Sequence, residues 1–409
     1  QLMKGNDLGL LHGIPISIKD TQMTKGVKTT SGTLIYKDRI AEADATIVDK
    51  VKKAGAIILG KTNTPELGLV GTCINKLGDQ GRNPWDITRT PGGSSGGAAA
   101  AVAAGLCSMA TGSDGGGSIR IPSNFCGIFG IKPTQGRVSA YNGSMSKSHN
   151  MFSQNGPLTR TVEDSALLLN VMAGPDEKDP ITYMLPPIDF ETILSKDVRG
   201  LKIAWSPDYG FASVEPEVLD VNYRAALHLE TLGCTVEEPK LNLYPPYDKY
   251  GAIITSDFYN SYGQYLDSHR EDMTDFCRFF IERGSQVTTK EYAETLGYID
   301  ALKGKMAQFF QSYDLLVSPT ACFPAFTDID LEDNFTDESD FPLHYFNGAF
   351  TMQGNLIGYP AASIPVGFTS NGLPVGLHVI APKHKEELIL SLALKFQETK
   401  PWIKSYLSI

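Results

Sequence analysis

Serines lie in two glycine-rich segments of the chain, and this setting suggests chemistry. The first segment, residues 92–97, reads GGSSGG and holds Ser94 and Ser95, while the second, residues 112–118, reads GSDGGGS and ends on Ser118. Glycine leaves backbone N–H groups uncovered by side chains, and consecutive N–H groups bind an oxyanion or a phosphate. The two segments therefore predict a site for a negatively charged group beside serine hydroxyls.

Phosphate binding is the first alternative, and it fits the second segment poorly. The Walker pattern ends in Gly-Lys-Ser/Thr, whereas residues 112–118 contain no lysine. Asp114 would also repel a phosphate. Acyl transfer, with a serine as nucleophile, is the interpretation that we pursue.

An α/β-hydrolase elbow is the second alternative, since residues 92–96 and 93–97 both match Gly-x-Ser-x-Gly. That class needs a histidine later in the chain, and only His344 and His378 have suitable sequence surroundings. An elbow also leaves the second glycine segment unexplained. The esterase-like interpretation stays open at this point.

A lysine can replace histidine as the base if burial keeps its amine neutral. Residues 13–20 read GIPISIKD, in which isoleucines alternate with other residues as in a strand. Lys19 stands at the end of this strand and points away from the isoleucine face. It is the lysine best placed to act as a base, with a second serine relaying the proton. A solvated surface lysine is the other interpretation of this octet.

The elements that must position these residues alternate between strand and helix. Strands are expected at residues 13–20, 56–60, 201–205, 234–236, 314–318 and 375–381, and helices at 42–54, 98–105, 161–172, 215–232 and 386–396. Residues 62–91 contain many turn formers and indicate a long connection, whereas the tyrosine-rich residues 244–300 are helical in pattern. The alternation predicts one α/β domain over residues 1–409. We expect a mixed, mostly parallel central sheet covered by helices, with 244–300 as an inserted helical cap.

Composition excludes several function classes. Hydrophobic residues make up 42% and charged residues 20% of the 409, as in a soluble globular protein with a large core. The net charge of −10, without a dense Lys/Arg stripe, argues against nucleic-acid binding. No apolar run reaches the roughly 18 residues of a membrane span, and no leader precedes the first strand, so we expect a cytoplasmic protein without membrane contact. The six cysteines have no Cys-x-x-Cys spacing, and no metal or cofactor is expected.

These motifs resemble the amidase signature family. The resemblance is carried by residues 13–20, 91–105, 112–134, 156–169 and 358–379, and so it spans nearly the whole chain. It implies the family's single-domain fold and cleavage of an amide through an acyl-enzyme. By the same resemblance, Lys19 is the neutral base, Ser94 is the bridging serine on a cis peptide, and Ser118 is the nucleophile.

The resemblance also assigns supporting residues. The oxyanion hole would be formed by the backbone N–H groups of Gly115, Gly116, Gly117 and Ser118. Ser95, Asp114 and Arg120 would support the site from behind. The loop that lines the acyl pocket in the family would correspond to Leu69, Val70, Gly71 and Thr72.

Three departures from the family pattern stand out. The chain opens on Gln1, and several dozen helical residues that usually precede the lysine strand are not in it. His378 stands where the family often has glutamine, which needs no catalytic role. Residues 244–300 carry no motif that we can assign, and we expect this cap to decide substrate choice.

The substrate expected is a small amide. We expect apolar and aromatic side chains beside the pocket, which would suit aryl or alkyl amides, anilides and, by extension, carbamates; these are Leu69, Tyr141, Phe152, Phe258, Tyr259 and Tyr262. Plain core packing is the other interpretation of these aromatics. Whether the chain is a monomer or a homodimer stays open.

Two further function classes remain. The first is a glutaminase component of a tRNA amidotransferase, which would need partner chains and for which the acidic charge offers no RNA-facing patch. The second is a binding protein without catalysis, which would have lost one of Lys19, Ser94 and Ser118. All three are present.

Overall fold

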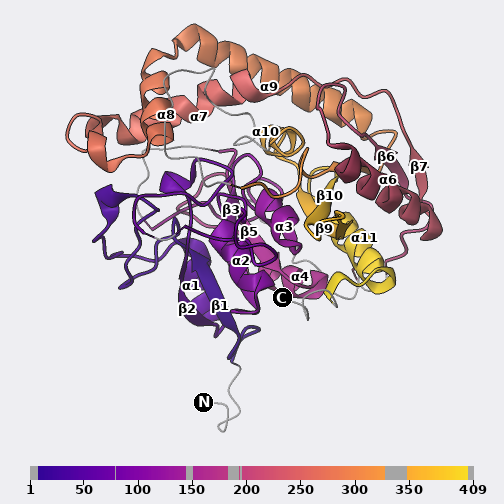
Figure 1. Ribbon diagram of the computed structural model, residues 1–409, viewed down its shortest axis with the longest axis horizontal. Coiled ribbons are helices and arrows are strands. Elements are labelled where there is room, and N and C mark those ends of the chain that lie inside the picture. Colours follow the sequence, from indigo (N-terminus) through magenta and orange to yellow (C-terminus); the bar gives the residue numbers. More distant parts are fainter. Residues whose placement is uncertain are drawn as a thin grey trace.

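The computed structural model describes residues 8–78, 80–143, 151–182, 193, 196–327 and 348–403, and Figure 1 shows its elements arranged around a central sheet. The strands are β1 (Pro15–Lys19), β2 (Ile57–Thr62), β3 (Met109–Asp114), β4 (Phe129–Lys132), β5 (Gln154–Thr159), β6 (Lys202–Trp205), β7 (Thr235–Glu237), β8 (Leu315–Pro319), β9 (Ala361–Phe368) and β10 (Pro374–Ile380). The helices are α1 (Thr46–Lys53), α2 (Gly96–Ala103), α3 (Arg120–Cys126), α4 (Val162–Met172), α6 (Pro216–Thr231), α7 (Tyr247–Tyr262), α8 (Asp275–Gln286), α9 (Thr289–Phe309), α10 (Met352–Leu356) and α11 (Glu386–Thr399). Short 3-10 turns lie at Leu34–Tyr36, Glu66–Gly68, Gly263–Tyr265 and Arg270–Asp272.

All of these strands belong to one sheet, in the order β2-β1-β3-β5-β4-β9-β10-β8-β6-β7. Pairing is parallel at both ends, among β2, β1 and β3 and again among β8, β6 and β7. The pairs between β3 and β8 are antiparallel. The predicted α/β class and mixed sheet are confirmed, and parallel pairing is confined to the two ends, where strands and helices alternate along the chain.

Both faces of the sheet are buried, and this places the sheet between two helical layers. One face carries Ile16 and Ile18 and packs with α1, α4, α6 and α11 in one apolar cluster. On the opposite face, α2 and α3 pack on Ala110 and Leu158, while α7, α8 and α9 share a cluster with Leu316. Figure 1 shows α7, α8 and α9 side by side in a layer of their own.

Residues 244–300 form α7, α8 and most of α9, and the described part of this span contains no strand. β3, β4, β5 and β9 were not among the predicted strands. β5 reads QNGPLT, a composition typical of a loop, yet all six residues are buried between β3 and β4. None of the helices in the described part of the chain has the length and apolar character needed to cross a membrane.

Candidate active site

Lys19 is fully buried at the carboxyl end of β1. Its amine donates to Ser94 Oγ at 2.7 Å and to Ser113 Oγ at 2.9 Å. Burial lowers the pKa of Lys19 from 10.5 to about 7, although nearby negative groups oppose the shift. A large fraction of the amine is therefore neutral at neutral pH. The interpretation as a solvated surface lysine is wrong.

Ser94 is held in a tightly packed turn. The peptide bond between Gly93 and Ser94 is cis, and the Ser94 carbonyl accepts a hydrogen bond from Thr64 Oγ1 at 2.8 Å. A Cβ on Gly93 would lie 2.0 Å from the carbonyl oxygen of Thr72, so this position tolerates only glycine. The turn directs the buried Ser94 hydroxyl at Lys19.

Ser95 links the first glycine segment to the second. Its hydroxyl donates to the carbonyl of Ser113 at 3.2 Å, and its N–H donates to the carbonyl of Ser118 at 3.0 Å. Directly after it, α2 packs its small residues against β3 and α3. Ser95 therefore holds the two glycine segments together by hydrogen bonds.

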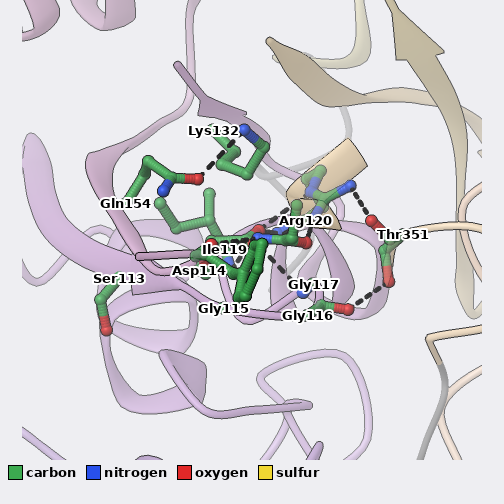
Figure 2. A network of polar contacts seen from close by, with 12 residues as sticks. Ser113, Asp114, Gly115, Gly116, Gly117, Ile119, Arg120, Lys132, Gln154 and Thr351 are labelled. Carbon is green, nitrogen blue, oxygen red and sulfur yellow. Dashed lines mark hydrogen bonds and ion pairs between the residues drawn. The ribbon is translucent and has the colours of Figure 1, made fainter. Parts of the chain in front are cut away.

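A buried ion pair lies behind the second segment, and Figure 2 shows its contacts. Arg120 donates to the two carboxylate oxygens of Asp114 at 2.7 and 2.9 Å, and both side chains are fully buried. Arg120 also donates to the carbonyl of Thr351 at 2.8 Å and to Asn355 Oδ1 at 2.6 Å. Burial alone would raise the pKa of Asp114, but the charge and hydrogen bonds of Arg120 hold it well below its usual range. The pair is charged and fixes the loop between its two members.

The carbonyl groups of the second glycine segment are bound away from the site. Tyr250 donates its hydroxyl to the carbonyl of Gly115 at 2.7 Å, and Thr351 Oγ1 donates to that of Gly116 at 2.6 Å. Among the described residues, none accepts a hydrogen bond from the N–H groups of Gly115, Gly116 and Ser118. These three N–H groups are available to an oxyanion.

Gly117 has a different role, and this corrects one prediction. Its N–H donates to Asp114 Oδ1 at 2.8 Å, so this group holds the loop and is not open to an oxyanion. The φ angle of Gly117 is +135°, and a Cβ would lie 2.4 Å from Thr351 Oγ1. The loop conformation therefore requires glycine here.

Ser118 is partly exposed and lines a cavity of about 300 Å³ together with Ser94 and Ser113. Its hydroxyl makes no hydrogen bond to any described residue. The structure thus brings Lys19 and Ser94 into contact and puts Ser118 on the same cavity, while the Ser94–Ser118 hydrogen bond is not formed. Such catalytic contacts are often long in free enzymes and tighten when the substrate binds.

One wall of the cavity is the loop of residues 67–71. The predicted pocket residues Leu69, Val70 and Gly71 lie in this wall. Thr72 does not, because it is buried under the backbone of Gly93. That part of the prediction is wrong.

Glu66 joins this cavity wall to the helical residues 244–300. Its carboxylate accepts from the N–H of Thr274 at 2.7 Å and from Thr274 Oγ1 at 2.5 Å, and its other oxygen accepts from Thr33 Oγ1 at 2.6 Å. Thr274 directly precedes α8. Burial raises the pKa of Glu66 even though these hydrogen bonds oppose the shift. The buried carboxyl group of Glu66 therefore joins the cavity wall to residues 244–300.

Comparison with known proteins decides the family. The family model described as Amidase matches residues 1–390. The chain belongs to the amidase signature family. It is 37% identical to an acylamidase of Rhodococcus erythropolis over 97% of this chain and 83% of that protein. It is also 37% identical to a glutamyl-tRNA(Gln) amidotransferase component of Carboxydothermus hydrogenoformans over 99% of this chain and 87% of that protein.

A solved structure of a bacterial aryl acylamidase is similar to this amidase with a TM-score of 0.89. The two sequences are 30% identical, and the match covers 99% of this chain and 86% of the other. Because the family consists of amidohydrolases, the chain is a hydrolase of carbon–nitrogen bonds.

The predicted pocket aromatics divide into two groups. Phe258 and Tyr262 line the cavity of this amidase, as does Leu69. The other three are not among the lining residues: Phe152 is buried in the core, Tyr259 is 45% exposed, and Tyr141 stands in the chain between two lining residues, Ala140 and Asn142.

No histidine lines the cavity within the described part of the chain, which removes support for the hydrolase elbow. His378 lies in β10 with its Nε2 2.9 Å from a guanidinium nitrogen of Arg120. Burial and the charge of Arg120 lower the pKa of His378 well below its usual range, so the ring is neutral and accepts this hydrogen bond. His344 lies outside the described residues. No group of three or more possible metal ligands is found among the residues that the structure describes.

Four residues of the site were missed from sequence: Ser113, Tyr250, Thr351 and Asn355. Ser113 alone had a usable signal, since it lies inside the second glycine segment one residue before Asp114. The parallel register of β1 with β3, in which Ile18 lies opposite Thr111, then brings the end of β3 beside Lys19. The other three come from α7, from the residue directly before α10 and from α10 itself, and no local sequence pattern connects them to this segment.

Proposed function

We propose that this amidase hydrolyses small amides, among them aryl or alkyl amides and anilides, through an acyl-enzyme formed on Ser118. The contact between the buried amine of Lys19 and Ser94 Oγ, beside the cavity that Ser118 lines, carries the proposal. A neutral lysine has a lone pair and can accept a proton from a serine hydroxyl.

The reaction would proceed in two halves. Ser118 Oγ attacks the amide carbonyl, its proton passes to Ser94, and the Ser94 proton passes to Lys19. The oxyanion accepts hydrogen bonds from the N–H groups of Gly115, Gly116 and Ser118. The Lys19 ammonium then returns a proton through Ser94 to the departing amine, and a water molecule repeats the path to release the acid.

An acylamidase activity has the best support among the substrate classes. Leu69, Ile254, Phe258 and Met352 make a large part of the cavity wall apolar, which suits an alkyl or aryl group. Two of the similar proteins named above are acylamidases. Carbamates present the same carbonyl group and belong to the same proposal.

A glutaminase activity in a tRNA amidotransferase is the second candidate, because several relatives are components of such enzymes. Glutamine carries an α-carboxylate, for which a binding site normally supplies a cationic partner. Among the described residues that line the cavity, there is no lysine, arginine or histidine. This favours the acylamidase over the glutaminase.

The test is turnover of p-nitroanilides, esters and aryl carbamates by the isolated chain. We expect Ser118→Ala to lower kcat by at least about a thousandfold and to abolish labelling by a sulfonyl fluoride. Ser108→Ala, a serine directly before β3 and outside the cavity lining, is the matched control and should stay active. Normal activity in Ser118→Ala would refute the nucleophile, and glutamine hydrolysis without anilide hydrolysis would favour the second candidate.

A further inference from the structure

A small hollow of the cavity lies beside Ser94, where Gly68 has no side chain. A Cβ on Gly68 would lie 3.5 Å from Ser94 Oγ and 3.5 Å from Thr21 Cγ2, and both are ordinary van der Waals distances. Gly68, Ser94 and Thr21 all line the cavity, and Gly68 is partly exposed to it. The three residues therefore border a space that can hold a methyl group next to the Ser94 hydroxyl.

The turn that carries Gly68 is held by hydrogen bonds. The N–H of Gly68 donates to the carbonyl of Pro65 at 2.9 Å, and the N–H of Leu67 donates to the carbonyl of Ser31 at 2.8 Å. The buried carboxyl group of Glu66 joins the same turn to residues 244–300. Because these contacts fix the backbone, the size of the hollow is set by the missing side chain of Gly68.

The proposed proton transfer determines where the leaving nitrogen must lie. Ser94 returns a proton from Lys19 to the departing amine, so this nitrogen must come within hydrogen-bond distance of Ser94 Oγ. A carbon bonded to such a nitrogen then lies roughly 3.6 Å from Ser94 Oγ. The hollow at Gly68 lies at the same distance from this oxygen.

The wall around the hollow suits an apolar substituent on that nitrogen. Leu67 and Leu69 flank Gly68 in the chain, and both line the cavity. A primary amide has only hydrogen atoms on its nitrogen and would leave the hollow unfilled. An alkyl or aryl group on the nitrogen would fill it and bury apolar surface.

We propose that the hollow beside Gly68 receives the first carbon of the substituent on the leaving nitrogen and makes this amidase selective for N-substituted amides over primary amides. The inference rests on the proposed amide hydrolysis and names the substrate class of the same site. Glutamine, a primary amide, falls outside this class.

The test compares butyramide with N-methylbutyramide, and the released ammonia or methylamine is measured by chromatography. Both probes form the same acyl-enzyme, so a difference in kcat/KM arises in the steps that involve the amine. We expect the wild type to favour N-methylbutyramide about fourfold, the effect of burying one methyl group. In Gly68→Ala the new methyl group occupies the hollow, and the ratio of the two kcat/KM values should fall about 10-fold.

Gly372→Ala is the matched control. Gly372 has a φ of +76° and Gly68 a φ of +73°, so alanine strains both positions alike. A Cβ on Gly372 would meet no described atom within 4 Å, and Gly372 is not among the described residues that line the cavity. Gly372→Ala should keep the wild-type ratio.

A second pair of probes separates the leaving amine from the acyl group. Acetamide and butyramide share their amine and differ in the acyl chain, so Gly68→Ala should leave the ratio of their kcat/KM values as in the wild type. If the hollow instead holds part of the acyl group, this ratio will change, and the proposal is overturned.

If Gly68→Ala does not fold, Thr21→Ser decides. This variant removes Cγ2, which borders the hollow, and so enlarges the space. The kcat/KM for N-isopropylbutyramide relative to N-methylbutyramide should then rise about fourfold. An unchanged ratio would overturn the proposal.

A wild type that does not favour N-methylbutyramide over butyramide would overturn the role of the hollow while leaving amide hydrolysis intact. A wild-type ratio that persists in folded Gly68→Ala would do the same. Failure of the wild type to cleave any amide or anilide would instead overturn the proposed function.

Discussion

The buried environment of the Lys19 amine determines whether that amine can act as a base. Lys19 lies at a strand end where sequence alone also allowed a solvated lysine, and complete burial lowers its pKa to about 7. A second buried lysine, Lys132, has its pKa lowered to about 7 by burial as well, yet it donates to the Pro133 carbonyl and to Gln154, whereas Lys19 donates to Ser94, a residue of the cavity lining. Position separates a candidate base from a structural lysine with a similar pKa.

We expect kcat/KM to fall as the pH decreases through about 7, because protonation of Lys19 removes the lone pair that accepts the serine proton. Above that pH the amine is neutral and kcat/KM reaches a plateau. The measurement is the pH profile of p-nitroanilide hydrolysis by the wild type and by Lys132→Met, which removes the other described amine with a pKa of about 7. The ionisation should persist in Lys132→Met; its disappearance there, or a flat wild-type profile, would mean that Lys19 is not the titrating base.

At the scale of elements, the site depends on contacts between segments far apart in the chain. α7 binds the carbonyl of Gly115 through Tyr250, and the turn before α10 binds the carbonyl of Gly116 through Thr351. The first contact fixes the peptide group that carries the N–H of Gly116, and the second fixes the peptide group whose N–H, that of Gly117, binds Asp114. Helix α7 thus supports the second glycine segment in addition to lining the cavity.

Tyr250→Phe tests this support. Loss of the hydroxyl frees the Gly115 carbonyl, so we expect kcat to fall about 10-fold with little change in KM, the effect of one hydrogen bond. Tyr259→Phe is the control on the same helix, since that ring is 45% exposed and outside the lining. Steady-state kinetics on one anilide measures both variants, and equal kcat values in the two would show that Tyr250 does not position the loop.

At the scale of the whole molecule, Arg120 connects helices α3 and α10 to the central sheet. From α3 it binds Asp114 at the end of β3, Asn355 in α10 and His378 in β10. All of these partners are buried, so removal of the guanidinium would leave a carboxylate uncompensated in the core.

Arg120→Met should therefore lower the free energy of unfolding by about 3–5 kcal/mol. Arg224→Met removes an arginine from an ion pair with Asp220 on α6, where the arginine side chain is 66% exposed, and should cost less than about 1 kcal/mol. Urea unfolding followed by fluorescence compares the two variants. Similar midpoints would contradict the structural importance of the buried pair.

The sequence predicted most elements and the main chemical groups because both leave local patterns. Glycine around Ser94 and Ser118, strand alternation before Lys19 and helical spacing in 42–54 and 215–232 can each be recognised without knowing the fold. Family resemblance then grouped the lysine with the two serines, and the structure places both serines on one cavity with Lys19 in contact with Ser94.

Features that depend on partners distant in sequence emerge only when the chain is folded. β5 is a strand because β3 and β4 bind it on both sides, despite its glycine and proline. Gly117 is excluded as an oxyanion donor because the carboxylate of Asp114 turns toward its N–H. Local sequence sets which groups are available, but burial and long-range hydrogen bonds determine the pKa of Lys19 and the direction of the peptide groups in the second glycine segment.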